Sequence, residues 1–388
     1  MYLVLYLGLL SCQIVRWKAY IWAPSYLRSS DPDPRVPDHQ KHLVFVMVDH
    51  YEHGGPRKLA EGAKANALWL RAFRPIADRH RDSYGNKFRY TWFYPYDHRN
   101  ESILISLCKM AYDGYGEVEL HWHHPAADSA TFPQMLAQAI AWFQRYGALI
   151  SSGPKPETHF AFIHGNWCLD NSVPGGICGV NRELDILFGH GCYADFTFST
   201  IGTVAQPAKV NSIYYATDTD DPKSYDDGVD AEVGKPVNDR LMIFEGPIGI
   251  DWISAGFEYG GVGDELPSPR RVDQWLDANV HVKGRPQWVF VKVYTHGAQG
   301  GKRLLHGHLD PMLSDLERIC ADRGISLHYM TTREAYNAVK AAEDGKTGDP
   351  EQYRDYRIPK PCNMLFHTEV PVAIKSVTQT KAEYEPVQ

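Results

Sequence analysis

Histidine and carboxylate side chains follow several apolar segments of this 388-residue chain, at the point where each segment ends. The apolar run over residues 43–48 ends on Asp49 and His50, and Glu52 and His53 follow closely. Three later apolar segments also end on or beside histidine, at residues 121–124, 164–167 and 295–297. Because the carboxyl ends of parallel strands meet on one side of an α/β fold, these groups are predicted to converge on one site. The alternative for the first group alone is a polar loop after a core strand.

His121 and His123 have the spacing of a metal-binding pair. Alternate residues of a strand point to the same side, so these two imidazoles are expected to lie together, with His124 on the other side or in the following loop. A carboxylate or imidazole from residues 49–53 would complete three protein ligands and leave a position open for water. The alternative is a polar strand end with one packed histidine.

A metal with an open position activates water and polarises a carbonyl group. Attack on an acyl carbon also needs a base for the water proton and an acid for the leaving group. Asp49 and His296, from different strands, are the predicted base and acid. The alternative for His296 is a structural histidine at a turn. Lys292 lies four residues before His296 and so falls on the same side of the strand. It is expected to point either to an interior carboxylate or outward.

Strand-like and helical segments alternate along the chain and would position these residues. Apolar, strand-like segments lie at residues 41–48, 89–95, 116–124, 159–167, 192–198, 212–217, 240–246, 287–297 and 326–332. Helical spacing of apolar residues falls at 57–80, 101–112, 131–147, 180–189, 270–280, 310–324 and 333–345. This alternation predicts a parallel α/β fold. The number of repeats favours a closed or nearly closed (β/α) barrel over an open sheet.

Composition narrows the range of ligands. The net charge of −7 and the lack of a basic run argue against nucleic acid as a partner. The sequence has no G-x-G-x-x-G and no Walker A loop, so nucleotide binding is not expected. Seven cysteines without a C-x-x-C pair predict buried free thiols rather than a disulfide framework.

The strand-end motifs resemble the polysaccharide deacetylase family, which has the NodB-homology or carbohydrate esterase 4 type of fold. The family's first motif, a buried strand ending in two adjacent acids, corresponds to Asp49-His50. Its pair of metal histidines corresponds to the cluster at residues 121–124, and its late histidine to His296-Gly297. The stretches GEVELHWHH, FAFIHGNWCLDNS, GCYADFTF and VFVKVYTHGAQ resemble more closely a divergent branch found among bacterial surface-glycan genes.

The resemblance covers about residues 41–335 and implies a distorted seven-stranded (β/α) barrel. It implies a metal-dependent hydrolase that removes N- or O-linked acetyl groups from a bacterial polysaccharide or glycan precursor. The expected cofactor is a divalent metal, zinc first, with cobalt, manganese and nickel as alternatives. The rival interpretations are a non-catalytic glycan-binding or assembly protein and another metal-assisted amide or glycoside hydrolase on the same barrel.

The resemblance also assigns roles to individual residues. His50, standing where the family has an acid, is predicted to bind the metal with His121 and His123. Asp195 corresponds to a further acid of the family that would orient His296. The remaining candidates are substrate-contacting or ligand-supporting residues, namely Glu52, His53, His124, His164, Asn166 and Trp167.

Three regions are predicted along the chain: an apolar segment and linker at 1–40, the catalytic barrel at 41–345 and an extension at 346–388. Residues 2–15 are apolar and are followed by Arg16 and Lys18. They suit a signal or a membrane anchor, or else an interfacial or buried helix. Residues 24–40 hold four prolines and are predicted to be a linker, and the acidic stretch 217–230 a solvated excursion.

Overall fold

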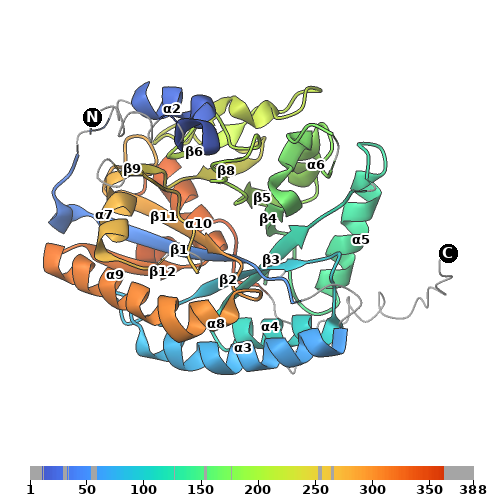
Figure 1. Cartoon of the computed structure of the whole chain (residues 1–388), viewed down its shortest axis with the longest axis horizontal. Helices are drawn as coiled ribbons and strands as arrows, with labels where there is room; N and C mark the ends of the chain where they lie inside the picture. Colours follow the sequence, from blue (N-terminus) through green and yellow to red (C-terminus); the bar gives the residue numbers. More distant parts are fainter. Residues whose placement is uncertain are drawn as a thin grey trace.

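A computed structural model describes residues 11, 13–28, 33, 35–53, 59–125, 127–152, 155–175, 177–251, 256–263 and 266–361. It has a mixed α/β fold, in which helices surround a central, mostly parallel sheet (Figure 1). The alternation of strands and helices expected from the sequence is therefore confirmed.

The main sheet contains ten strands in the order β11-β1-β2-β3-β4-β5-β8-β6-β7, and β12 pairs with β1. Its strands are β1 (His42–His50), β2 (Tyr90–Pro95), β3 (Gly116–Trp122), β4 (Phe160–His164), β5 (Cys192–Asp195), β6 (Ser212–Ala216), β7 (Gly228–Asp230), β8 (Met242–Glu245), β11 (Trp288–Thr295) and β12 (Ser326–Met330). Only the pairings of β6 with β7 and β8 are antiparallel in this sheet. A separate antiparallel hairpin joins β9 (Gly249–Asp251) and β10 (Gly256–Glu258).

Strand β1 lies at the centre of this architecture. It pairs with β11 along nearly its whole length, with β12 over residues 42–46 and with β2 over residues 48–50. Leu43, Phe45 and Met47 pack into the core beneath the helices. Residues Val44, Val46 and Val48 belong to a second core on the opposite face. Burial on both faces explains why this strand has a continuous apolar sequence.

The sheet curls strongly. Phe244 of β8 and Phe290 of β11 belong to strands far apart in the sheet order, yet their ring centroids are 6.2 Å apart. In a flat sheet, neighbouring strands alone are about 4.8 Å apart, so these two strands could not touch. Within the described residues, strand pairing does not run back from β7 to β11, so closure into a barrel is not established by the pairing.

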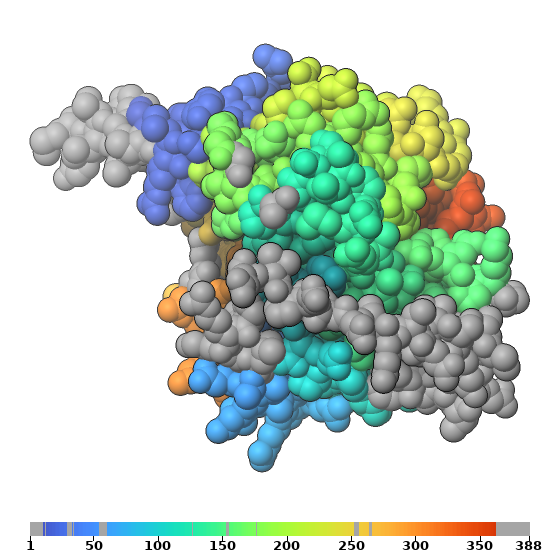
Figure 2. Space-filling model, turned by 90° about the vertical axis from the view of Figure 1, so that its right-hand side faces the viewer, coloured from blue at the N-terminus to red at the C-terminus, as the bar shows by residue number. Residues whose placement is uncertain are grey.

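The helices cover the sheet and connect its strands. They are α2 (Ala19–Arg28), α3 (Leu59–Arg79), α4 (Glu101–Tyr112), α5 (Phe132–Gln144), α6 (Glu183–Gly189), α7 (Pro269–Asp277), α8 (Gly301–Arg303), α9 (Leu309–Arg323) and α10 (Thr332–Glu343), with a π-helical stretch at Leu304–His308. Short 3₁₀ helices lie at Asp38–Gln40, Gly165–Trp167, Leu169–Asn171, Ser224–Asp226 and Pro350–Tyr353. Helices α2 (dark blue) and α3 (light blue) lie at opposite ends of the molecule (Figures 1 and 2).

Helix ends follow local sequence. Thr331 and Glu334 form a capping box at the start of α10, and the Asn100 side chain accepts a hydrogen bond from Ser102 N at the start of α4. Gly324 ends α9 with φ 71°, the left-handed C-terminal position that glycine commonly occupies. The described cysteines at 108, 168, 178, 192 and 320 are buried free thiols, as expected.

Some local predictions are wrong. The linker assigned to residues 24–40 begins later, because α2 continues through Pro24 to Arg28. Packing of Trp22 against Ile201, Val210 and Ile248 stabilises this helix. The acidic stretch 217–230 is only partly solvated, since it contains β7 and the buried Tyr225.

Two predictions at the ends of the chain fall largely on residues that the structure does not describe. They are the signal or anchor at 2–15 and the extension at 346–388, of which residues 362–388 lie outside the described part. No helix in the described part of the chain has both the length and the apolar character needed to span a membrane.

Candidate metal centre

Glu52, His121 and His123 form a compact group of potential metal ligands. Nε2 of His121 and Nε2 of His123 each lie 3.6 Å from Oε1 of Glu52. One ligand atom from each of the three residues lies within 4.8 Å of the others. The two histidines come from the end of β3 and the residue just beyond it, so their alternate spacing places both rings on one side, as the strand period predicts.

The second ring nitrogen of each histidine is fixed by an oxygen. Nδ1 of His121 donates to the backbone oxygen of Ile163 over 2.8 Å, and Nδ1 of His123 donates to Oδ2 of Asp97 over 3.0 Å. Asp97 also accepts a hydrogen bond from the amide of His123. With the proton on Nδ1, Nε2 keeps its lone pair, which is the arrangement of metal-binding histidine. Nε2 of His121 is buried and has no hydrogen-bond partner among the described residues.

The electrostatic surroundings of Glu52 favour its ionised carboxylate beside the two imidazoles. Burial alone would raise the pKa of Glu52, but the close contact with His121 and its attraction, and then the charge of His123, outweigh burial and lower that pKa. Burial works against the charged form of His123, and the contact with Asp97 overcomes it, so the pKa of His123 is raised. Gln299 donates to the other oxygen of Glu52 over 2.7 Å, which leaves Oε1 facing the histidines.

His50, the ligand predicted on strand β1, lies beside this group. Its ring is stacked on that of His296, with centroids 4.5 Å apart, and its centroid is 5.0 Å from that of His121. Burial, followed by the charges of His296 and His121, holds the pKa of His50 well below its usual range. The geometry favours Glu52 over His50 as the third ligand and leaves His50 and His296 as a neighbouring pair of imidazoles.

Asp49, the predicted base, is buried with both carboxylate oxygens in hydrogen bonds. Tyr90 donates its hydroxyl proton to Oδ2 over 2.8 Å, and the amide of Gly297 donates to Oδ1 over 2.7 Å. Burial raises the pKa of Asp49 to about 8, against the effect of these two hydrogen bonds. The carboxylate therefore holds the backbone that follows His296.

The turn after His296 is fixed from both sides. Besides the bond to Asp49, the carbonyl of Gly297 accepts a hydrogen bond from Nε1 of Trp69 over 2.9 Å. A Cβ atom at Gly297 would lie 2.6 Å from Oδ2 of Asp49 and 2.8 Å from the hydroxyl of Tyr90. A glycine is therefore required here by close packing.

An open cleft of about 1180 Å³ lies next to the group. His296 and Gln299 line it, and Gln299 connects it directly to Glu52. His53 also lines the cleft, and burial lowers the pKa of its imidazole to about 4. A ligand in this cleft would lie against His296.

The other predicted site residues do not join the group of Glu52, His121 and His123. His124 and His164 are buried in a second cluster with Cys178 and Glu183. Asn166 is exposed, and Trp167 packs against the main core.

Asp195 was expected to orient His296. Its carboxylate accepts its described hydrogen bonds from the amide and hydroxyl of Thr197, and burial raises its pKa to about 7. Lys292 is buried facing Glu245 and Asp195, and burial lowers its pKa to about 8 against the attraction of these two carboxylates. Lys292 therefore points to interior carboxylates, which is one of the two directions expected from the sequence.

Several residues of this region were not singled out from the sequence: Tyr90, Asp97 and Gln299, together with Trp69. Asp97 had a usable signal, because it follows the strand next to both β1 and β3. The sequence gives no such signal for Gln299 and Trp69, since their contacts join segments that are remote in sequence. No family model matches the chain, and no curated protein matches it either.

Proposed function

We propose that this protein is a metal-dependent hydrolase that removes acyl groups, in the first place N- or O-linked acetyl, from a carbohydrate. The observation that carries the proposal is the group of Glu52, His121 and His123 beside an open cleft. Its connection to acetylated glycans rests on the resemblance of the strand-end motifs to polysaccharide deacetylases.

The residues present fit a divalent metal. One carboxylate and two imidazoles are a common protein ligand set for zinc with an open position, and cobalt, manganese or nickel would suit the same donors. The buried, unpartnered Nε2 of His121 and the Nδ1 contacts of both histidines are what such a site requires. When bound there, the metal supplies a Lewis acid for a carbonyl oxygen and for water.

The imidazole pair provides for proton movement. The uncharged imidazole of His50 lies between His121 and His296, and this position beside the metal group would let it accept a proton from the attacking water. His296 lines the cleft and is placed to protonate the leaving nitrogen or oxygen. Asp49 acts as a positioning residue in this scheme, because it holds the backbone at Gly297.

The cleft suits an extended substrate. Its volume of about 1180 Å³ exceeds the roughly 300–1,000 Å³ of pockets that enclose single small molecules. Its open form would let a glycan chain lie across His296. We also propose that the curled sheet is the distorted barrel of such enzymes. In support, residues 260–262 hydrogen bond to Tyr294 and so cover the outer edge of β11.

The direct test is acetate release from a panel of N- and O-acetylated oligosaccharides by protein reconstituted with Zn²⁺ or Co²⁺. Glu52→Gln and His121→Ala should lose metal and activity together. His190→Gln, at the end of α6, is the matched control and should keep both. A full-length protein that binds metal at this group but hydrolyses none of the panel, while a known deacetylase does, would favour a non-catalytic glycan-binding role.

A further inference from the structure

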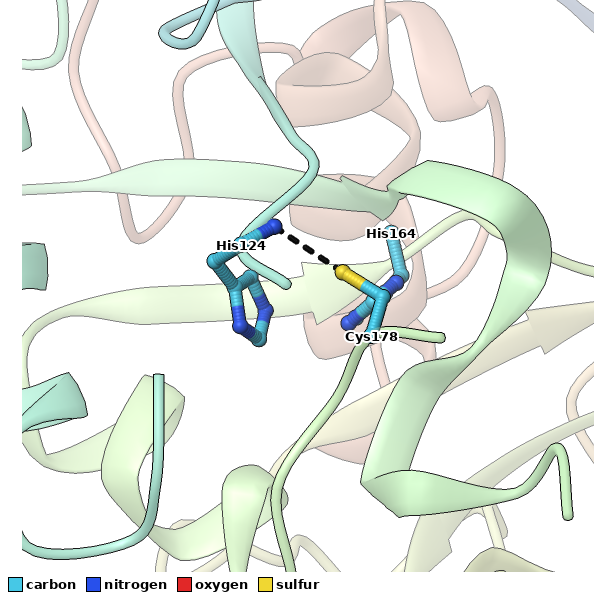
Figure 3. A group of neighbouring side chains, drawn as sticks. All are labelled: His124, His164 and Cys178. Carbon is cyan, nitrogen blue, oxygen red and sulfur yellow. Dashed lines mark hydrogen bonds between the residues drawn. The ribbon is translucent and has the colours of Figure 1, made fainter. Parts of the chain in front are cut away.

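A second cluster of potential ligands lies apart from Glu52. It contains His124 after β3, His164 at the end of β4, Cys178 in the loop that follows, and Glu183 in the first turn of α6. The relative exposure of these four residues is 2% or less. Figure 3 shows the His124, His164 and Cys178 side chains gathered from separate segments, and one ligand atom of each lies within 4.8 Å of the others.

Ion-pair contacts hold the carboxylate and imidazoles of this cluster together, but their geometry is poor for hydrogen bonds. Oε1 of Glu183 lies 2.7 Å from Nε2 of His124 and 3.3 Å from Nε2 of His164. Among the described residues, these three atoms and Nδ1 of His124 have no hydrogen-bond partner of acceptable geometry. Leaving a buried polar group unsatisfied costs about 1–3 kcal/mol. Donor atoms gathered this closely, with hydrogen-bond geometry unmet, form an arrangement that a bound cation would satisfy.

The surrounding backbone directs these atoms inward. Nδ1 of His164 donates to the carbonyl of Gly165 over 2.6 Å, so its Nε2 keeps the lone pair. The amide of Asp170 donates to Oε2 of Glu183 over 2.7 Å, which leaves Oε1 for the cluster. Sγ of Cys178 accepts a hydrogen bond from the amide of His124 over 2.9 Å (Figure 3). The amide contact suits a thiolate.

We propose that His124, His164, Cys178 and Glu183 bind a structural zinc ion, in addition to the metal of the proposed hydrolase site. A thiolate with imidazoles selects zinc over magnesium or calcium. Two neutral imidazoles, one thiolate and one carboxylate balance the two charges of zinc, so the complete site is electrically neutral and suits burial. Four protein ligands leave no open position, which is the pattern of structural sites.

The ion would attach the irregular segment after β4 to the end of β3. That segment contains Asn166, Trp167, Asp170 and Asn171 in left-handed conformations and forms two short 3₁₀ helices rather than a longer regular element. It also touches the hydrolase site, because a Cβ atom at Gly165 would lie 2.2 Å from the ring of His123. The structural zinc would thus fix the wall against which His123 rests.

Cobalt substitution tests this site independently of any hydrolase activity. Full-length protein produced with Co²⁺ in place of zinc should show a thiolate-to-cobalt charge-transfer band, which only a cysteine-containing site gives. Cys178→Ala should lose the band and one equivalent of metal per chain. Cys320→Ala, which removes a buried thiol from α9, is the control and should keep both.

The two metal sites are separated with His121→Ala, which should lose the hydrolase metal and keep the band and one equivalent of zinc. If Cys178→Ala does not fold, zinc-edge X-ray absorption on His121→Ala replaces it, with one sulfur expected at about 2.3 Å from zinc. The proposal is overturned if His121→Ala protein holds no zinc, or if its zinc has no sulfur neighbour. In that case the cluster is a metal-free network of a carboxylate and two histidines.

Discussion

The amide of Gly297 donates a hydrogen bond to Oδ1 of Asp49, joining residues 248 positions apart in the sequence. This bond fixes the turn that follows His296 to the end of β1, where His50 stacks on His296. Tyr90 occupies the other oxygen of Asp49. The residue expected to be the base therefore has a clear structural task, and in the proposed mechanism the two imidazoles beside it move the protons.

Substitutions at Asp49 distinguish a positioning residue from a base. Asp49→Asn can still accept from Gly297 and can donate to the hydroxyl of Tyr90, so we expect kcat to fall by less than about tenfold, whereas removal of a general base costs about 10²–10⁴-fold. Asp49→Ala leaves two buried donors unpaired and should lower the free energy of unfolding by about 2–5 kcal/mol. Steady-state kinetics and urea unfolding measure these effects. A 10³-fold loss in a folded Asp49→Asn protein would return the role of base to Asp49.

The close packing at Gly297 predicts that even a methyl group is not tolerated there. In Gly297→Ala, the new Cβ would collide with Oδ2 of Asp49, the hydroxyl of Tyr90 and Leu304. We expect the free energy of unfolding to fall by about 1–3 kcal/mol, as for other overpacked sites. We also expect kcat to fall by a larger factor than this destabilisation alone would cause, because His296 is displaced. Gly300→Ala is the control in the same turn, since its Cβ would lie no closer than 3.4 Å to its nearest neighbour. Equal melting temperatures for the two variants would contradict this account.

The order of strands and helices could be predicted because apolar periodicity records burial directly. The continuous run at 43–48 fills two cores, and the spacing of His121 and His123 gives a shared direction while the chain remains extended. The alternation of side-chain direction holds only within the strand. β1 ends at His50, so the direction of Glu52 depends on its contact with Gln299, 247 positions away.

The cluster of His124, His164, Cys178 and Glu183 could not be predicted from the sequence for the same reason. His124 and His164 were noted at strand ends, but Cys178 and Glu183 reach them from a loop and a short helix. Left-handed residues at 166, 167, 170 and 171 set the path of that loop, and no periodic pattern encodes it. The covering of β11 by residues 260–262 is likewise a tertiary property, since these residues lie outside any apolar run.

Asp97 is expected to control metal binding through His123. Its carboxylate fixes the ring through Nδ1 and strengthens Nε2 as a donor. Asp97→Asn should weaken affinity for Zn²⁺ at the hydrolase site by about 10–100-fold, as for other residues that orient a metal-binding histidine. Competition with a chromophoric chelator measures this affinity. Asp315→Asn, at a half-buried carboxylate on α9 paired with Arg318, is the control and should leave affinity unchanged. Unchanged affinity in Asp97→Asn would exclude His123 as a ligand.

Glu351 should make stability depend on pH in the acid range. Its carboxylate accepts hydrogen bonds from Arg354 over 2.7 and 2.8 Å and lies 3.2 Å from Nδ1 of His328. Burial opposes its charge, but His328 and then Arg354 outweigh that effect and lower its pKa from 4.5 to about 2. The folded protein therefore releases this proton more readily than the unfolded chain does. The resulting stability, about 1–2 kcal/mol once solvent screening of this half-buried group reduces the full effect of the shift, is complete above pH 4.5 and is lost as the pH falls toward 2.

The Glu351 prediction is checked by urea unfolding of the whole protein at successive pH values between 7 and 2. Glu351→Gln should be less stable at neutral pH and should show a flatter decline below pH 5, because it has no proton to gain there. Glu157→Gln removes a carboxylate whose side chain is 57% exposed and should follow the wild-type curve. Parallel curves for wild type and Glu351→Gln would mean that the contacts with Arg354 and His328 do not favour the ionised carboxylate in solution.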